Sequence, residues 1–538
     1  KLAILMKGTA DVYAPKVVRA ATGSLFRMPV VSMASAKELA EFTGAAGKKL
    51  TATCLDARRW YYDEDLTHDI ALIIGNEEVF TEDTHIVYNK YTGEPYAQIS
   101  LAGPEQVEAA ASAAYEAFRS VPFDALARYN VLMKASQLLS ERADDLAMTM
   151  VAEAGKTLQD AKNEVLWSVD LLTESAEEAR RLHGTCFGFW GDGWMDSRTC
   201  YTRKEPIGPV AAIAPFNFPL NLVIHKIAPA LAAGNPVLLK PAEVTSVIGL
   251  KICRLLMDAG APKGYVSCLT GSGSAIGPLL TANEKIAFYS FTGSVDVGKS
   301  IKSAIGLRQC AMELGSNAAT IVCEDYDLAS AVASCADAAF CNAGQVCIHL
   351  QRIYVQRPIY EEFVARLTEA AKAKVVGDPM ASATDIGPMI AEKEALRVER
   401  WVAEAVAGGA EVHCGNRREK ALFWPTVLTG TTRDMRVVQE EVFGPVVCVM
   451  PFDTMQEAYD MVNDSRYGLN TGILTNNIAV AMEATRVLQS GSVIVGGTCG
   501  FRIGNMPYGG VKDSGFGKEG PRYAIEKMSQ TKAVVILN

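Results

Sequence analysis

The sequence has too few cysteines, too irregularly placed, for a scaffold held together by disulfides. Its 538 residues include 13 cysteines, an odd number, and no Cys-x-x-Cys pair occurs. The six histidines do not stand at zinc-finger spacing from cysteines. We therefore expect a protein of the reducing cytoplasm that has no metal site and buries most of its thiols as small apolar side chains.

The chain also lacks an excess of positive charge and a long uninterrupted apolar run. Its net charge of -9 argues against a protein built mainly to bind nucleic acid. The longest apolar stretch, from Ile207 to Ile224, is interrupted by three prolines and two asparagines. It predicts strand, loop and helix start rather than a membrane span. No secretory signal peptide is visible, and the sequence begins with Lys1, as a fragment would.

The sequence does have the composition and periodicity of a large soluble α/β protein. Apolar residues make up 49% and charged residues 21%, and the length allows two or three domains. Apolar residues recur at helical spacing over 109–118, 132–151 and 158–182. From residue 208 to about 495, short apolar runs alternate with helical stretches. This is the βαβ pattern of parallel sheets with helices on both faces.

One segment, Phe340-Cys-Asn-Ala-Gly-Gln-Val-Cys347, offers a candidate nucleophile. Cys347 follows a Gly-Gln turn and precedes an apolar run that ends at Val355, so its thiol stands where a loop meets a strand. A substrate could reach it there, and nearby donors or charges that lower its pKa would make it reactive. A cysteine in apolar surroundings is more often inert, and we interpret Cys341 as structural.

The nucleophile segment resembles that of the aldehyde dehydrogenase superfamily, and the resemblance covers residue 87 to the C-terminus. Four other segments match in the right order, including Ala214-Pro-Phe-Asn-Phe-Pro219, Met312-Glu-Leu-Gly-Ser-Asn317 and Glu440-Glu-Val-Phe-Gly-Pro445. The resemblance implies an α/β fold with a Rossmann-like dinucleotide-binding domain, an α/β catalytic domain and a β oligomerisation arm. It also implies a homo-oligomer, a dimer or tetramer.

The same resemblance implies NAD(P)-dependent oxidation of a small aldehyde to a carboxylic acid. Cys347 would form a thiohemiacetal, hydride would leave for the cofactor, and water would hydrolyse the thioester. Asn217 would hold the oxyanion together with the backbone N–H of the nucleophile. Glu313 would activate the water, and its apolar neighbours predict a raised pKa that suits a base.

The resemblance also implies a set of cofactor contacts. Lys240 and Glu243 match positions that contact the adenosine ribose, where a carboxylate accepts two hydroxyls but repels a 2′-phosphate. This favours NAD, with NADP as the alternative. The helix that follows Phe291-Thr-Gly-Ser294 would present N–H groups to the pyrophosphate. The remaining cofactor-binding candidates are Phe216, Gly273, Gly277, Phe291, Thr292, Gly293, Ser294, Gly298, Glu313, Leu314, Glu441 and Phe443.

Within the superfamily, three segments resemble one branch most. They are Asn217-Phe-Pro-Leu-Asn-Leu-x-x-His-Lys226, Cys347-x-x-x-Gln-Arg352 and Met506-Pro-Tyr-Gly-Gly-Val-Lys512. That branch holds lactaldehyde, glycolaldehyde and non-phosphorylating glyceraldehyde-3-phosphate dehydrogenases. The loop at 496–505 departs from the family pattern beside the expected substrate mouth. Its Arg502 is either a solvated or paired loop residue, or a grip for an anionic or hydroxylated aldehyde.

The first 78 residues do not continue this pattern. Residues 9–30 resemble the centre of a SpoU-type trefoil-knot RNA methyltransferase, and residues 70–77 resemble the second motif of that family, whose first and third motifs are missing. This segment holds ten Lys or Arg and ten Asp or Glu, so it has no overall basic surface for RNA. We interpret it as a gene-fusion or assembly remnant.

We therefore expect four parts. They are a truncated methyltransferase-like extension at 1–78, an NAD-binding domain at 79–186 and 207–316, a catalytic domain at 317–495, and an oligomerisation arm with the C-terminal segment at 187–206 and 496–538.

Three other functions stay open: a CoA-acylating dehydrogenase, an RNA methyltransferase acting through the extension, and a binding protein without catalysis. Glu313 argues against the first, the missing motifs against the second, and the Cys, Asn and Glu set against the third.

Overall fold

The computed structural model describes residues 3–6, 30–33, 70–187 and 198–537. The chain divides into two compact units, Lys1–Leu66 and Thr67–Asn538. In the first unit, β1 (Ala3–Met6) pairs in parallel with β2 (Val30–Met33). Most of the segment at 9–30 that resembles a methyltransferase lies outside the described residues.

The second unit begins earlier than the expected boundary at residue 78. Here β3 (Leu72–Ile74) and β4 (Glu77–Val79) form an antiparallel pair, and β3 pairs with β11 (Val266–Cys268) of the first large sheet. Leu72 and Ile73 are completely buried. The segment at 70–77 therefore belongs to the sheet of the second unit rather than to a methyltransferase-like extension. Its apolar run contributes to the core of that unit.

The first large sheet has a parallel centre and antiparallel edges. Its strands, in spatial order, are β25 (Gly515–Phe516), β13 (Gln309–Glu313), β12 (Phe288–Thr292), β9 (Val210–Ile213), β10 (Val237–Lys240), β11, β3 and β4. The expected alternation of strands and helices is confirmed at the centre of this sheet. The two antiparallel edges come from chain segments at 72–79 and 515–516, which the βαβ pattern did not reveal.

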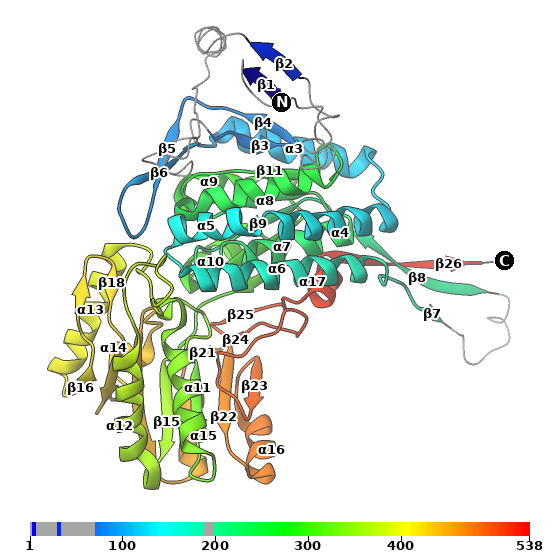
Figure 1. The fold of residues 1–538 in the computed structure, drawn as a ribbon. Helices are drawn as coiled ribbons and strands as arrows, with labels where there is room; N and C mark the ends of the chain where they lie inside the picture. Colours follow the sequence, from blue (N-terminus) through cyan, green and yellow to red (C-terminus); the bar gives the residue numbers. More distant parts are fainter. Residues whose placement is uncertain (1–2, 7–29, 34–69, 188–197, 538) are drawn as a thin grey trace, which may run out of the picture. The chain divides into compact units, whose positions relative to one another are not determined.

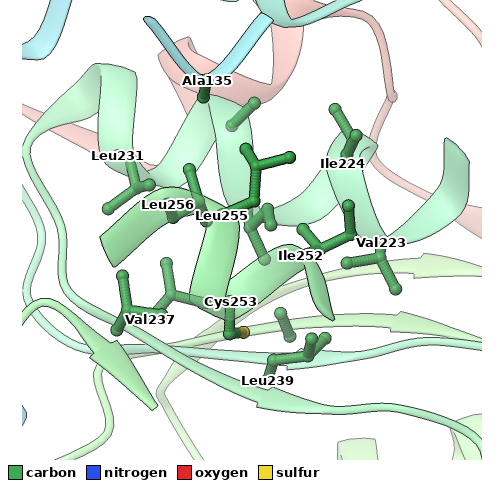
Figure 2. Packing of buried hydrophobic residues seen from close by; sticks show 14 of the residues in the cluster. Ala135, Val223, Ile224, Leu231, Val237, Leu239, Ile252, Cys253, Leu255 and Leu256 are labelled. Atoms are coloured by element: carbon green, nitrogen blue, oxygen red, sulfur yellow. The ribbon is translucent and has the colours of Figure 1, made fainter. Parts of the chain in front are cut away.

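Helices cover both faces of this sheet because its central strands are apolar on both sides. In β9, Val210 and Ala212 belong to one buried cluster, while Ala211 and Ile213 belong to another. The first face is covered by α7 (Asn221–Ala233) and α8 (Ser246–Asp258), on which α4 (Ala125–Glu141), α5 (Ala143–Ala154) and α6 (Leu158–Ala179) pack as a further layer. The second is covered by α3 (Pro104–Ser120), α9 (Gly273–Ala282) and α10 (Val295–Ala304). Figure 2 shows how α7 and α8 pack their aliphatic side chains over Val237 and Leu239.

A second sheet carries the next part of the chain and is parallel except at β16. Its strands, in spatial order, are β16 (Glu411–Cys414), β19 (Thr426–Thr429), β20 (Val446–Phe452), β15 (Arg352–Gln356), β14 (Ala319–Val322), β22 (Asn470–Leu474) and β23 (Ser492–Val495). Its helices are α11 (Leu328–Phe340), α12 (Arg357–Ala373), α13 (Glu392–Ala407), α14 (Arg436–Gln439), α15 (Met455–Asn463) and α16 (Ile478–Val487). Together they enclose a separate apolar core.

A third sheet projects from the helices at the right of Figure 1. In it β26 (Ser529–Ile536) pairs antiparallel with β8 (Thr199–Pro206), and β8 also pairs with β7 (Cys186–Phe187). The remaining elements are β5 (Thr84–Tyr88), β6 (Pro95–Ser100), η3 (Glu243–Thr245), η4 (Cys341–Gly344), β17 (Arg418–Glu419), β18 (Leu422–Phe423), β21 (Tyr467–Gly468), β24 (Val511–Lys512) and α17 (Pro521–Lys527). Within the described ranges, no helix is both long and apolar enough to cross a membrane.

Candidate active site

The candidate residues of the first sheet gather at the carboxyl ends of its parallel strands. Lys240 is the last residue of β10, Thr292 the last of β12 and Glu313 the last of β13. Asn217 follows β9 by four residues. Because these four strands are neighbours, their ends form one edge, which is where open α/β sheets bind their ligands.

The turn before Cys347 has an unusual backbone. Asn342, Ala343 and Gly344 all have positive φ angles, of 51°, 54° and 69°. Such angles are costly for residues with a Cβ, by roughly 1 kcal/mol or more each. A Cβ on Gly344 would also collide with the carbonyl oxygen of Gly444. The turn is therefore pressed against the segment that carries Glu441 and Phe443, and only glycine fits at its closest point.

Asn217 joins the two sheets across this turn. Its Nδ2 donates to the carbonyl oxygen of Gln345 at 2.9 Å, and Asn342 Nδ2 donates to the carbonyl oxygen of Asn217 at 3.2 Å. Asn217 is buried. A side-chain amide has two N–H donors, so the bond to Gln345 orients the group and leaves one N–H for a ligand.

Cys347 is half-buried, and its Sγ lies 2.8 Å from the hydroxyl of Tyr508. Burial raises the pKa of the Cys347 thiol to about 11. The hydrogen bond to Tyr508 and the charge of Arg502 act to lower this pKa, whereas Glu441 and Glu313 act to raise it. Cys341, by contrast, is exposed at the start of η4. The pKa of Cys341 is also raised to about 11, so the contact with Tyr508, and not the pKa, distinguishes Cys347.

Glu313 is buried at the end of β13, with 4% of its surface exposed. Within the described residues, neither of its carboxyl oxygens has a hydrogen-bond partner. Burial, and then the negative charge of Glu519, raise the pKa of Glu313 well above its usual value. The pKa of Glu313 is therefore shifted in the direction that its apolar neighbours in the sequence predicted.

Two buried residues beside Glu313 were not among the candidates from the sequence. Lys226 Nζ lies 3.0 Å from Glu519 Oε1 and donates to Thr292 Oγ1 at 2.6 Å. Burial alone would raise the pKa of Glu519, but Lys226 and Arg502 hold it below its usual value. Lys226 ends one of the branch-like segments of the sequence and was given no role there. Nothing in the sequence pattern pointed to Glu519.

Arg502 reaches this cluster from the loop that departs from the family pattern. Its Nη2 donates to Glu519 Oε2 at 3.0 Å and contacts His225 Nε2 at 2.8 Å. Its guanidinium carbon lies 3.8 Å from the centre of the Tyr508 ring. Burial, followed by the charge of Arg502, lowers the pKa of His225 well below its usual value. The neutral imidazole therefore accepts from Arg502, which is a paired rather than a solvated residue.

The expected adenosine-ribose contacts lie beside an open surface. Lys240 is buried, its Nζ donates to the carbonyl oxygen of Pro241 at 2.9 Å, and burial lowers its pKa to about 8. An ammonium has three donors, so Lys240 retains N–H groups that fit ribose hydroxyls. Glu243 opens η3 nearby. A Cβ on Gly273 or Gly277 would meet no described atom within 4 Å, which leaves room for a ligand along α9.

Two glycines near the start of α10 are closely packed against neighbouring side chains. A Cβ on Gly293 would lie 2.5 Å from the Phe291 ring, and one on Gly298 would lie 2.6 Å from the Leu314 side chain. Ser294 occupies the N-cap of α10 without a side-chain capping bond. The first N–H groups of α10 are therefore placed to receive an anion such as a pyrophosphate.

The nicotinamide-side candidates come from the second sheet. Glu441 Oε1 accepts a hydrogen bond from the Ser316 N–H at 2.8 Å, and burial raises its pKa to about 7. Phe443 has a positive φ of 48° and stacks edge-to-face on Phe216, with ring centres 5.8 Å apart. The structure thus brings Phe443 against the segment that carries Asn217.

Gln351 ties the Glu441 segment to the nucleophile strand. Its Nε2 donates to the carbonyl oxygens of Val437 and Glu440, at 2.9 and 2.7 Å, and its Oε1 accepts from the Val442 N–H at 2.9 Å. Gln351 is completely buried and stands four residues after Cys347. One side chain therefore fixes the spacing between the thiol and the expected ribose contact.

A second buried ion pair supports the Asn217 segment. Lys156 Nζ lies 2.9 Å from Glu164 Oε2 and 3.6 Å from the centre of the Phe218 ring. Glu164 Oε1 accepts from the N–H groups of Leu220 and Asn221 at 2.9 Å each, which caps the start of α7. Both the ring and the helix start are thereby held in place on either side of Pro219.

A family model described as the aldehyde dehydrogenase family matches residues 79–534. A 3-sulfolactaldehyde dehydrogenase from Priestia megaterium is 46% identical, over 86% of this chain and 97% of that protein. A lactaldehyde dehydrogenase from Methanococcus vannielii is 37% identical, over 87% of this chain and all of that protein.

Solved structures share the fold. Aldehyde dehydrogenase 21 from Physcomitrella patens, in complex with the reaction product succinate, superposes with a TM-score of 0.85. It is 34% identical, over 87% of this chain and 98% of that one. The glyceraldehyde-3-phosphate dehydrogenase GapN from Methanocaldococcus jannaschii, complexed with NADP, gives a TM-score of 0.81. It is 35% identical, over 85% of this chain and all of that one.

Proposed function

This chain belongs to the aldehyde dehydrogenase family and is an NAD(P)-dependent enzyme that oxidises an aldehyde, and we propose that its substrate is a small aldehyde carrying an anionic group. The observation that carries the proposal is the position of Arg502. Its guanidinium stacks on the ring whose hydroxyl contacts the candidate nucleophile. Only the side chain of Tyr508 would separate an acidic group held by this arginine from Cys347.

The roles of the site residues follow from their contacts. Cys347 adds to the carbonyl carbon, and the free N–H of Asn217 Nδ2 and the backbone N–H of Cys347 hold the resulting oxyanion. When bound, the nicotinamide dinucleotide supplies the acceptor for the hydride. Glu313 then takes a proton from the water that attacks the thioester. Its unpaired carboxyl oxygens leave it free to hold that water.

The charges around Glu519 support an anionic substrate. Lys226 and Arg502 both pair with this carboxylate and hold its pKa below the usual value, so two cationic side chains share one ionised acid. The names of similar proteins agree with an anionic substrate, since a sulfolactaldehyde carries a sulfonate and succinate carries a second carboxylate. Arginine suits such groups because it offers paired donors.

NAD is the proposed cofactor in preference to NADP. Glu243 lies at the end of β10 beside Lys240, where a carboxylate would accept ribose hydroxyls and repel a 2′-phosphate. Similar enzymes include both NAD-dependent and NADP-bound examples. Steady-state rates with each cofactor at equal concentration test this preference directly.

We also propose that the protein is a homo-oligomer of the cytoplasm. The edge of β26 is exposed, and so are the apolar side chains of Val535, Ile536 and Leu537. An exposed apolar edge strand is suited to pairing with another subunit. Every cysteine that the structure describes is a free thiol, which fits a reducing compartment.

The test of the substrate class compares acidic aldehydes, such as sulfolactaldehyde and succinate semialdehyde, with neutral lactaldehyde and glycolaldehyde. We expect the acidic aldehydes to have higher kcat/KM in the parent. Arg502→Lys should reduce this preference, and Arg502→Met should abolish it, mainly through KM. The proposal fails if both variants affect acidic and neutral aldehydes equally, or if neutral aldehydes are preferred by the parent.

A further inference from the structure

We propose that Tyr508 is a catalytic residue whose hydroxyl donates a hydrogen bond to the Cys347 thiolate and so holds the nucleophile in its reactive form and orientation. The inference rests on the role given to Cys347 under the proposed function. The phenolic oxygen lies 2.8 Å from Sγ. Tyr508 is 1% exposed, so its hydroxyl is shielded from solvent.

Packing alone does not require a hydroxyl at this position. The ring of Tyr508 lies in a small apolar cluster with Ile348 and Leu469, which a phenylalanine would fill equally well. A buried hydroxyl without a partner is costly, so it is retained where it has one. The hydrogen bond that the structure gives this hydroxyl goes to the sulfur of Cys347.

The position of the Tyr508 ring is fixed by hydrogen bonds of the Tyr508 backbone and by contacts with Arg502. The Tyr508 N–H donates to the carbonyl oxygen of Glu519 at 3.2 Å, and the Glu519 N–H donates back at 2.7 Å. Arg502 covers one face of the ring and is itself held by Glu519 and His225. The hydroxyl therefore points at the sulfur because of contacts that involve neither substrate nor cofactor.

The direction of the hydrogen bond follows from the protonation of the two groups. Burial, and then the charge of Cys347, raise the pKa of Tyr508 well above its usual value. The phenol therefore keeps its proton at neutral pH, and a thiolate has none to give. Tyr508 can then only donate to the thiolate. Burial, Glu441 and Glu313 all oppose ionisation of Cys347, so this donor offsets part of their effect.

The test measures ionisation of the thiol in the free enzyme. Iodoacetamide, a neutral reagent, would alkylate the parent and Tyr508→Phe across a pH series, with the Cys347 peptide quantified by mass spectrometry. We expect the midpoint of the Tyr508→Phe profile to rise by about one pH unit or more, since a hydrogen bond to a charged group contributes at least that much. Cys347→Ala identifies the background from the other thiols.

Tyr459→Phe is the matched control. Tyr459 is also buried, and its hydroxyl donates to the backbone carbonyl of Val480 at 3.3 Å. Its removal should leave the midpoint unchanged. Tyr508→His keeps a ring N–H donor and should return the midpoint part of the way toward that of the parent.

An unchanged or lowered midpoint, in a Tyr508→Phe protein that melts at the temperature of the parent, would overturn the inference even if turnover falls. So would identical midpoints for Tyr508→His and Tyr508→Phe. The measurement uses no aldehyde and no cofactor. It can therefore fail while the assays with acidic aldehydes succeed, and the two proposals are tested separately.

Discussion

The carboxyl group of Glu313 lies against the bare backbone of Gly509: a Cβ at Gly509 would stand 2.6 Å from Glu313 Oε1. Gly509 has a φ of 156° and directly follows Tyr508. Any other residue there would push on the candidate base.

Glu313→Gln should slow hydrolysis of the acyl-enzyme far more than formation of NADH. A buried and unpaired carboxylate can take a proton from water, and a general base of this kind contributes about 10²–10⁴-fold. Stopped-flow absorbance should show a burst of NADH close to that of the parent, followed by a slow steady rate. Equal loss of burst and steady rate would mean that Glu313 does not act in deacylation.

The same Glu313→Gln substitution should stabilise the protein at pH 8 and have no such effect near pH 4. The pKa of Glu313 in the folded protein is raised above the ordinary 4.5. The unfolded chain therefore releases this proton at a lower pH than the folded protein does, so rising pH stabilises the unfolded state relative to the folded state. Below 4.5 both states are protonated and the amide is equivalent to the acid. Each unit of raised pKa corresponds to ~1.4 kcal/mol at high pH.

Urea unfolding at the two pH values measures this difference. Glu284→Gln is the control, because Glu284 is exposed in the short segment between α9 and β12. If Glu313→Gln destabilises the protein at pH 8, Glu313 has favourable contacts in the folded state, contrary to its lack of hydrogen-bond partners.

Cys347→Ala should reduce turnover by at least ~10³-fold while leaving NAD binding intact. The thiol forms the covalent bond but lies outside the expected dinucleotide contacts. Cys341→Ala should retain most activity, because that residue is exposed at the start of η4. Fluorescence titration with NAD, together with turnover, separates the two effects. Substantial turnover in Cys347→Ala would place the nucleophile elsewhere.

A chain that begins at Thr67 should keep the parent's activity, whereas one that begins at Val79 should be poorly folded. The second deletion removes β3 and exposes the surface of β11. Leu72 and Ile73 are completely buried, and each such side chain contributes about 1.5–3 kcal/mol. Melting temperature, soluble yield and turnover of the two proteins check this. Equal behaviour would show that β3 is dispensable.

The local signals of the site could be predicted from the sequence. Cys347, Glu313 and Asn217 each stand in a short motif at the end of a strand or turn, and the structure brings their segments together. The Lys226–Glu519 pair joins residues 293 positions apart, and the Cys347–Tyr508 contact spans 161. Such contacts depend on how distant segments pack together, which no local pattern records.

Some features of the fold were also beyond the sequence pattern. The apolar periodicity over 132–151 predicted one helix, but in the structure α4 ends and α5 begins at Arg142. The sequence pattern did not reveal this break because the apolar periodicity continues across it. Phe443 has a positive φ angle, which could not be predicted because the residue at this position is not a glycine. The strand β3 was assigned to an extension because its residues resemble another family. Pairing with β11, across nearly two hundred residues, decides its place.

The hydrogen bonds of Gln351 have a consequence for the distances within the site. They make the thiol and the Glu441–Phe443 segment parts of one rigid body, whereas Asn217 and Glu313 belong to the other sheet. Asn217 is itself bonded to the carbonyl oxygen of Gln345, two residues before Cys347, so the oxyanion donor stays tied to the segment that carries the thiol. The distance from the sulfur to the base Glu313 therefore depends on how the two sheets pack, whereas its distance from Glu441 is set within one sheet.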